Sequence, residues 1–134
     1  RVYQHAPVEQ RCGRGQIFPR EIDDISHKRT GTWKTCANTG IVLDGGDRPS
    51  LTPAGHFARN VTVSDYNIRV WDYASAVMLS GVGNAVTDSE LFRAPHQAIY
   101  AMGNDHLVAR NHIHDVVQHA CDSGSFYCGR DWTY

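Results

Sequence analysis

The stretch from His112 to Asp131 reads His-Ile-His-Asp-Val-Val-Gln-His-Ala-Cys-Asp-Ser-Gly-Ser-Phe-Tyr-Cys-Gly-Arg-Asp, and it contains a short apolar phrase that is followed by a glycine. That phrase occurs three more times upstream, and the four copies begin at residues 40, 76, 98 and 125. This loose recurrence is within the range of stacked repeats. The copies are Gly40–Leu43 with Gly45, Ala76–Leu79 with Gly81, Ala98–Ala101 with Gly103, and Ser125–Cys128 with Gly129.

A second phrase lies between these copies. Ala58–Val63 corresponds to Val108–Ile113, and Thr87–Leu91 is a weaker copy of both. Two alternating strand phrases per repeat predict a chain that winds and stacks its strands in register. Asn60 and Asn111 are expected to satisfy backbone groups at turns, which we prefer to a glycosylation site at Asn60-Val61-Thr62.

Alternation of side chains along a strand assigns the first phrase two faces. Like positions in neighbouring repeats are then expected about 4.7–4.9 Å apart, the ordinary spacing between strands. The inward row is predicted to be Ile41, Val77, Ile99 and Phe126, backed by Leu43, Leu79, Ala101 and Cys128. The outward row is Val42, Met78, Tyr100 and Tyr127, which places two tyrosines next to each other.

The composition describes one globular unit of 134 residues, with 41% hydrophobic and 20% charged residues. Poor helix formers dominate, which favours β structure. The formal net charge of −1 gives no reason to expect binding to nucleic acid or to an anionic membrane. No apolar run approaches the roughly 20 residues that span a bilayer. Because the chain begins at Arg1, we expect it to be processed or cut from something longer.

The four cysteines lack the paired spacing of a structural zinc site. Two alternatives remain open: disulfides from Cys12 to Cys36 and from Cys121 to Cys128, or free buried thiols. Disulfides would indicate an oxidising compartment.

Four phrases of the chain carry a family resemblance: Asn38–Gly46, Ala94–Tyr100, Gly103–Val116 and Asp122–Trp132. Together they resemble the right-handed parallel β-helix (pectate-lyase-like) proteins among secreted glycoside hydrolases and polysaccharide lyases. The resemblance implies an all-β fold, a right-handed parallel β-helix of about four to five coils over residues 38–134, preceded by an irregular segment and loop over residues 1–37. Relatives of this kind usually have more coils, so the chain is expected to be a fragment of a longer helix. The resemblance also implies a secreted or periplasmic protein that acts on a polysaccharide or oligosaccharide.

Glycoside hydrolysis requires two carboxyl groups about 5–5.5 Å apart for retention or about 6.5–9.5 Å for inversion. Aligning the repeats places Asp105 and Asp131 in one column, and Asp122 precedes the last copy. We predict Asp122 and Asp131 as the acid pair, with Asp105 as a further catalytic candidate. The structural alternative is that each aspartate forms a turn.

Polar and aromatic side chains near these carboxylates are predicted to contact the sugar. Trp71 and Tyr73 lie in an insertion that would form a wall beside the substrate, or simply pack. In a non-catalytic alternative, Trp33 and the exposed aromatics would stack on a glycan without turnover. The predicted substrate-binding residues are His96, Tyr100, His106, His114, Tyr127, Arg130 and Trp132.

No cofactor is expected for hydrolysis. His112 and His114 share a strand face, so a metal held with Asp115 or His119 is a less favoured alternative. A polysaccharide lyase is the enzymatic alternative, and it would need Ca²⁺ and a basic residue, Arg110 or Arg130. The carboxylates available for Ca²⁺ would be Asp44, Asp47 and Asp105.

Overall fold

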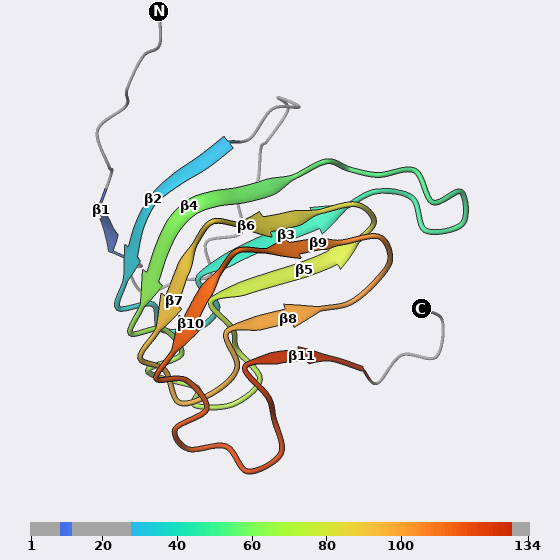
Figure 1. The fold of residues 1–134 in the computed structure, drawn as a ribbon. Helices are drawn as coiled ribbons and strands as arrows, with labels where there is room; N and C mark the ends of the chain where they lie inside the picture. Colours follow the sequence, from blue (N-terminus) through green and yellow to red (C-terminus); the bar gives the residue numbers. More distant parts are fainter. Residues whose placement is uncertain (1–8, 12–27, 130–134) are drawn as a thin grey trace, which may run out of the picture.

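The computed structural model describes residues 9–11 and 28–129, which form eleven strands in two parallel sheets (Figure 1). The chain passes repeatedly from one sheet to the other. The four-stranded sheet, in the order β11-β8-β5-β3, contains β3 (Ile41–Gly45), β5 (Val77–Gly81), β8 (Ile99–Ala101) and β11 (Phe126–Cys128). The seven-stranded sheet contains β1 (Glu9–Arg11), β2 (Lys28–Lys34), β4 (Phe57–Ser64), β6 (Ala85–Thr87), β7 (Glu90–Phe92), β9 (Leu107–Ala109) and β10 (His112–His114).

The predicted register of the apolar phrases is confirmed. Ile41 pairs with Val77, Val77 with Ile99, and Ile99 with Phe126, all in parallel. The second phrase is also in the predicted register, since Ala58 pairs with Val86, which in turn pairs with Val108. Sequence positions far apart along the chain therefore lie side by side at the spacing of neighbouring strands.

The core lies between the two sheets, because the buried apolar cluster takes side chains from both. Ile41, Val77 and Ile99 of the predicted inward row are buried, as the alternation required. Phe126 is not, since 46% of its surface is exposed on the edge strand β11. Trp33 is buried in the core, so it packs there and does not offer its ring to a glycan as the non-catalytic alternative supposed.

The prediction of a right-handed parallel β-helix of four to five coils was wrong: the structure has two parallel sheets and no closed solenoid over the described residues. The reason lies in the loops at 65–76, 93–98 and 115–125, which lead from the seven-stranded to the four-stranded sheet. These loops contain turns and bends but no strands, so no further sheet closes the coil. Strand β2 also falls inside the segment expected to be irregular, and it pairs with β4.

The seven-stranded sheet bends in the middle of β4, between β6 and β7, and between β9 and β10. β4 pairs with β6 through residues 57–59 and with β7 through residues 62–64. Between these halves, Asn60, Asp88 and Arg110 have φ values of 53°, 54° and 53°, in the left-handed region. At the bend, Asn111 accepts a hydrogen bond from the Ser89 amide (3.1 Å) and donates one to the Val86 carbonyl (3.0 Å). The predicted turn role of Asn111 is therefore confirmed.

Cys36 is disulfide-bonded, whereas Cys121 and Cys128 are free and exposed. Of the two alternatives for Cys121 and Cys128, the disulfide is absent, and the free thiols are exposed rather than buried. Cys12 lies outside the described residues. In the part of the chain that the structure describes, no helix has the length and apolar character needed to cross a membrane.

Candidate functional site

The predicted catalytic aspartates are not brought together by the described residues. Asp105 follows β8, and Asp122 precedes β11, and both are exposed. Because β8 and β11 pair in parallel with Ile99 opposite Phe126, Asp105 lies beyond one end of this strand pair and Asp122 beyond the other. Asp131 lies outside the described residues, as do Arg130 and Trp132, so the pair of Asp122 and Asp131 stays a prediction.

Two predicted histidines have structural contacts. His106 accepts a hydrogen bond from the Asn84 amide at Nδ1 (3.2 Å), and its Nε2–H donates to the Met102 carbonyl (2.9 Å). His96 is only 3% exposed, and its Nε2 lies 2.9 Å from Asp72 Oδ1. Both imidazoles therefore hold turns and loops in place, and Nδ1 of His96 is buried without a hydrogen-bond partner among the described residues.

Tyr100 and Tyr127 are adjacent, as the outward row predicted. They face each other across β8 and β11 in register, with ring centroids 5.8 Å apart and planes tilted by 47°. Both are partly buried, so each presents only part of its ring to solvent.

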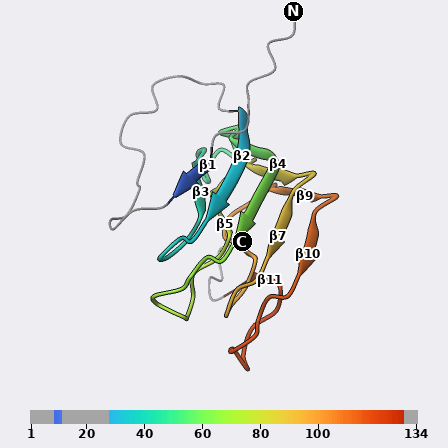
Figure 2. The ribbon, with the colours of Figure 1, turned by 90° about the vertical axis from the view of Figure 1, so that its left-hand side faces the viewer.

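A hollow of about 290 Å³ lies where three loops meet at one edge of the seven-stranded sheet. β4, β7 and β10 are parallel neighbours, so the loops that follow them emerge at the same edge (Figure 2). The loops continue the pairing of the strands: the Asp65 amide donates to the Arg93 carbonyl (3.1 Å), and the Ala94 amide to the Asp115 carbonyl (3.1 Å). We call this the loop hollow; Asp65, Ile68, Trp71, Arg93, Ala94, Pro95, Gln118 and His119 line it.

Trp71 supplies the largest aromatic surface of the loop hollow. Trp71 is 53% exposed, and its indole N–H donates a hydrogen bond to the Ile68 carbonyl (2.9 Å). The His119 ring lies beside it, with centroids 4.6 Å apart. The indole is thus held in position while much of its surface stays open to solvent.

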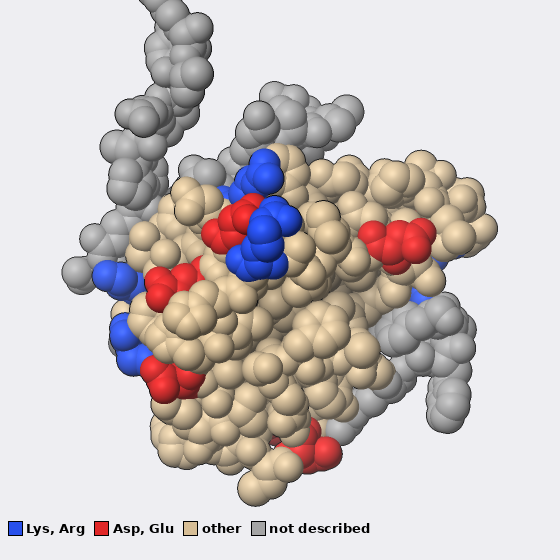
Figure 3. All heavy atoms as spheres, in the orientation of Figure 1, with Lys and Arg blue, Asp and Glu red and all other residues tan. Residues whose placement is uncertain are grey.

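A charged pair forms the polar side of the loop hollow. Arg93 donates two hydrogen bonds to Asp65, from Nε to Oδ1 (2.9 Å) and from Nη2 to Oδ2 (2.8 Å). The hydrogen bonds from Arg93 are the main reason that the pKa of Asp65 lies below its ordinary value. On the face shown in Figure 3, the basic side chains at the top and left lie beside acidic ones, other acidic groups stand apart, and neither sign forms a large patch.

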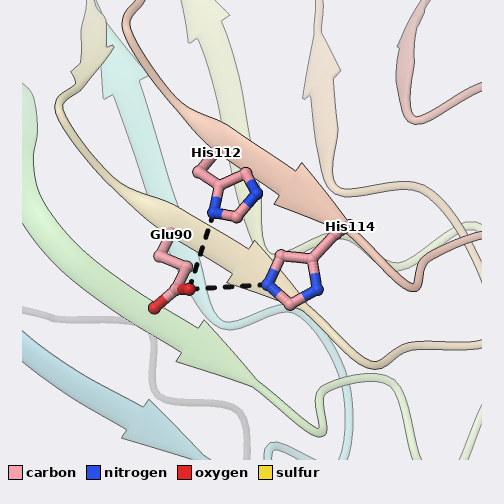
Figure 4. Close-up of side chains that lie close together, drawn as sticks. All are labelled: Glu90, His112 and His114. Atoms are coloured by element: carbon pink, nitrogen blue, oxygen red, sulfur yellow. Dashed lines mark ion pairs between the residues drawn. The ribbon is translucent and has the colours of Figure 1, made fainter.

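A separate cluster on the outer face of the sheet combines Glu90 of β7 with His112 and His114 of β10 (Figure 4). It is the only group of three or more His, Cys, Asp or Glu side chains within residues 9–11 and 28–129 whose ligand atoms are close enough to share an ion. Asp44, Asp47 and Asp105 therefore do not assemble the Ca²⁺ site that a lyase would need. Arg110, a candidate lyase base, is paired with Asp88.

The sequence had identified the two histidines as a metal-binding alternative but not their acidic partner. The missing signal was present in the repeat alignment, where Glu90 of the weaker copy falls opposite His112, as the strand pairing confirms. Asp115 contacts the other nitrogen of His114, and His119 lies in the loop hollow.

Comparison with protein-family models, with curated proteins and with solved structures found no match to this chain. The resemblance to carbohydrate-active proteins therefore stays a prediction, and function has to be argued from the geometry above.

Proposed function

We propose that the protein binds carbohydrate, with the loop hollow as its binding site and Trp71 as the platform for a sugar ring. The observation that carries the proposal is the open, fixed indole of Trp71 beside hydrogen-bonding side chains. A pyranose ring has an apolar face that suits an aromatic ring and a rim of hydroxyls that needs polar partners. The sequence had placed Trp71 in a loop that could form a substrate wall.

The polar lining suits the hydroxyl rim of a sugar. Asp65 and Arg93 are bonded to each other, but the guanidinium has five N–H donors and the carboxylate about four acceptor sites, so both keep capacity for sugar hydroxyls. Gln118 and His119 add one amide and one imidazole on the opposite loop. A volume of about 290 Å³ is at the lower end of small-molecule sites, which run from roughly 300 to 1,000 Å³. We infer that the loop hollow holds one sugar ring or chain end.

The electrostatics favour binding over hydrolysis at this site. A glycosidase needs one carboxylic acid whose pKa is raised so that it can donate a proton. Asp65 is the carboxyl group that lines the loop hollow, and its pKa is lowered by Arg93. It is therefore ionised at neutral pH and accepts hydrogen bonds instead of protonating a leaving group.

The disulfide at Cys36 supports the expected location. Disulfides persist in oxidising compartments and are rare in a reducing cytosol. We propose that the protein is secreted or periplasmic, where it would meet polysaccharides.

A glycan array followed by calorimetry on the best ligand tests the proposal. We expect the wild-type chain to retain at least one glycan and the Trp71→Ala variant to bind it about 30-fold more weakly. That ratio corresponds to roughly 2 kcal/mol, the loss typical of truncating an anchoring aromatic. Tyr127→Ala is the matched control, since it removes a ring from the other predicted surface and should leave affinity unchanged.

Two results would contradict this assignment. If Tyr127→Ala lost affinity and Trp71→Ala did not, the sugar would bind on the outer face of the four-stranded sheet. If the wild-type protein released reducing ends or unsaturated products from a retained glycan, it would be an enzyme rather than a binding module.

A further inference from the structure

The cluster of Glu90, His112 and His114 is built by the strand register. His112 and Glu90 lie directly opposite each other on the paired strands β10 and β7. His114 lies two residues beyond His112 and so points to the same face of the sheet. All three offer a ligand atom, and these atoms lie within 4.8 Å of one another (Figure 4).

His114 is oriented by contacts on two sides. Its Nδ1 lies 2.9 Å from Asp115 Oδ2, and an ionised carboxylate can only accept, so Nδ1 carries a proton. Its ring is stacked on Phe92, with centroids 4.8 Å apart and planes within 12° of parallel. A carboxylate that accepts from the far nitrogen is the feature that typically orients a histidine bound to a metal.

The remaining nitrogen of His114 faces the other ligands without a hydrogen bond. Nε2 is shielded from solvent and has no hydrogen-bond partner among the residues that the structure describes. It lies 3.5 Å from Glu90 Oε1. A metal ligand binds through a ring nitrogen that carries no proton, and Nε2 is the His114 nitrogen that faces Glu90 and His112.

The two distances from Glu90 fit ligands around an ion better than a hydrogen-bonded ion pair. A charge-assisted hydrogen bond would bring nitrogen and oxygen to about 2.7–2.9 Å. A tetrahedral ion with bonds of about 2.0–2.1 Å holds its ligand atoms about 3.4 Å apart. Glu90 Oε1 lies 3.7 Å from His112 Nδ1 and 3.5 Å from His114 Nε2. Both separations are closer to the second value.

We propose that Glu90 Oε1, His112 Nδ1 and His114 Nε2 form a binding site for a divalent transition-metal ion of the Zn²⁺ type. Two imidazoles and one carboxylate suit zinc and its neighbours, whereas Ca²⁺ and Mg²⁺ prefer oxygen ligands alone. The side chains of His112 and Glu90 are 73% and 45% exposed, so an ion can enter directly from solvent. The same exposure leaves a fourth coordination position for water or a ligand.

Calorimetric titration of the full chain with Zn²⁺ at neutral pH tests the site, with visible spectroscopy of added Co²⁺ as a second readout. We expect one ion per chain and a tetrahedral Co²⁺ spectrum. His112→Ala, His114→Ala and Glu90→Gln should each weaken binding at least about tenfold, and Asp115→Asn about 10–100-fold because it orients a ligand. The control is His119→Ala, which removes an exposed histidine outside the cluster and should change affinity less than about twofold.

Urea unfolding of each variant shows whether the fold is retained, and these surface substitutions are expected to leave it intact. The proposal is overturned if the wild-type chain takes up no stoichiometric Zn²⁺, or if His119→Ala weakens binding as much as His114→Ala. Full affinity in Glu90→Gln would also overturn the three-ligand site. Sugar binding by Trp71 is a separate property, so failure of either proposal leaves the other standing.

Discussion

At the scale of single residues, glycine permits the closest approach between successive turns of the chain. Gly45 and Gly81 pair in register, and a Cβ on Gly81 would lie 2.0 Å from the Gly45 carbonyl oxygen. Gly103 stands in the same relation to Gly81, again at 2.0 Å. No Cβ fits at Gly81 or Gly103, which explains the glycines after the two central phrases, whereas a Cβ on Gly129 would meet nothing within 4 Å.

Gly81→Ala and Gly55→Ala together separate steric clash from backbone strain. Both glycines have a left-handed backbone, with φ of +86° and +71°, but a Cβ on Gly55 would meet nothing within 4 Å. We expect Gly55→Ala to lower the free energy of unfolding by about 1–2 kcal/mol. Gly81→Ala should cost a further 1–3 kcal/mol or so from overpacking. Urea denaturation measures both, and equal losses would show that the turns are not stacked this closely.

At the scale of elements, the bend of the seven-stranded sheet is bridged by a charge ladder across β4, β6 and β9. Asp88 follows β6 and accepts hydrogen bonds from Arg110 Nη2 (2.9 Å) and Arg59 Nε (3.1 Å). The hydrogen bonds from Arg110, and then those from Arg59, hold the pKa of Asp88 well below its ordinary value. The ladder holds the left-handed residues Asp88 and Arg110 together with Arg59, which precedes the left-handed Asn60.

The charge ladder predicts a pH-dependent effect of Asp88→Asn. Because the folded state lowers the pKa of Asp88, its carboxylate stabilises the fold above the unfolded pKa of about 4. This contribution is lost as the pH falls towards the folded pKa. The stability difference between wild type and Asp88→Asn should therefore be full at pH 7, shrink below about pH 4, and shrink in high salt, since both arginines are exposed. Urea unfolding between pH 3 and 7 measures it; a difference constant over this range would contradict the ladder.

At the scale of the whole molecule, the register of the repeats could be predicted and the closure of the fold could not. The apolar phrases alternate with period 2 and are followed by a glycine, so their sequences can be aligned without a structure. This alignment predicted the pairing of Ile41, Val77 and Ile99 correctly. The path of the loops at 65–76, 93–98 and 115–125 depends on long-range packing, which leaves no local pattern in the sequence. The exposure of Phe126 could not be predicted either, since its phrase does not reveal that β11 is an edge strand.

The same limit applies to the candidate sites. Trp71 was recognised as part of a projecting loop, but its neighbours Asp65 and Gln118 are brought to it only by the parallel order of β4, β7 and β10. Glu90 belongs to the cluster for the same reason. Both sites are therefore consequences of the strand register.

The strand register is tested most directly by nuclear Overhauser effects between the methyl groups of isoleucine, leucine and valine in the folded chain. Strands about 4.8 Å apart bring like positions into range. We predict cross-peaks between Ile41 and Val77, between Val77 and Ile99, and between Leu43 and Leu79. Cross-peaks from Ile41 to Leu79 and from Leu43 to Val77 in their place would mean antiparallel pairing, and would contradict both the two parallel sheets and the sites built on them.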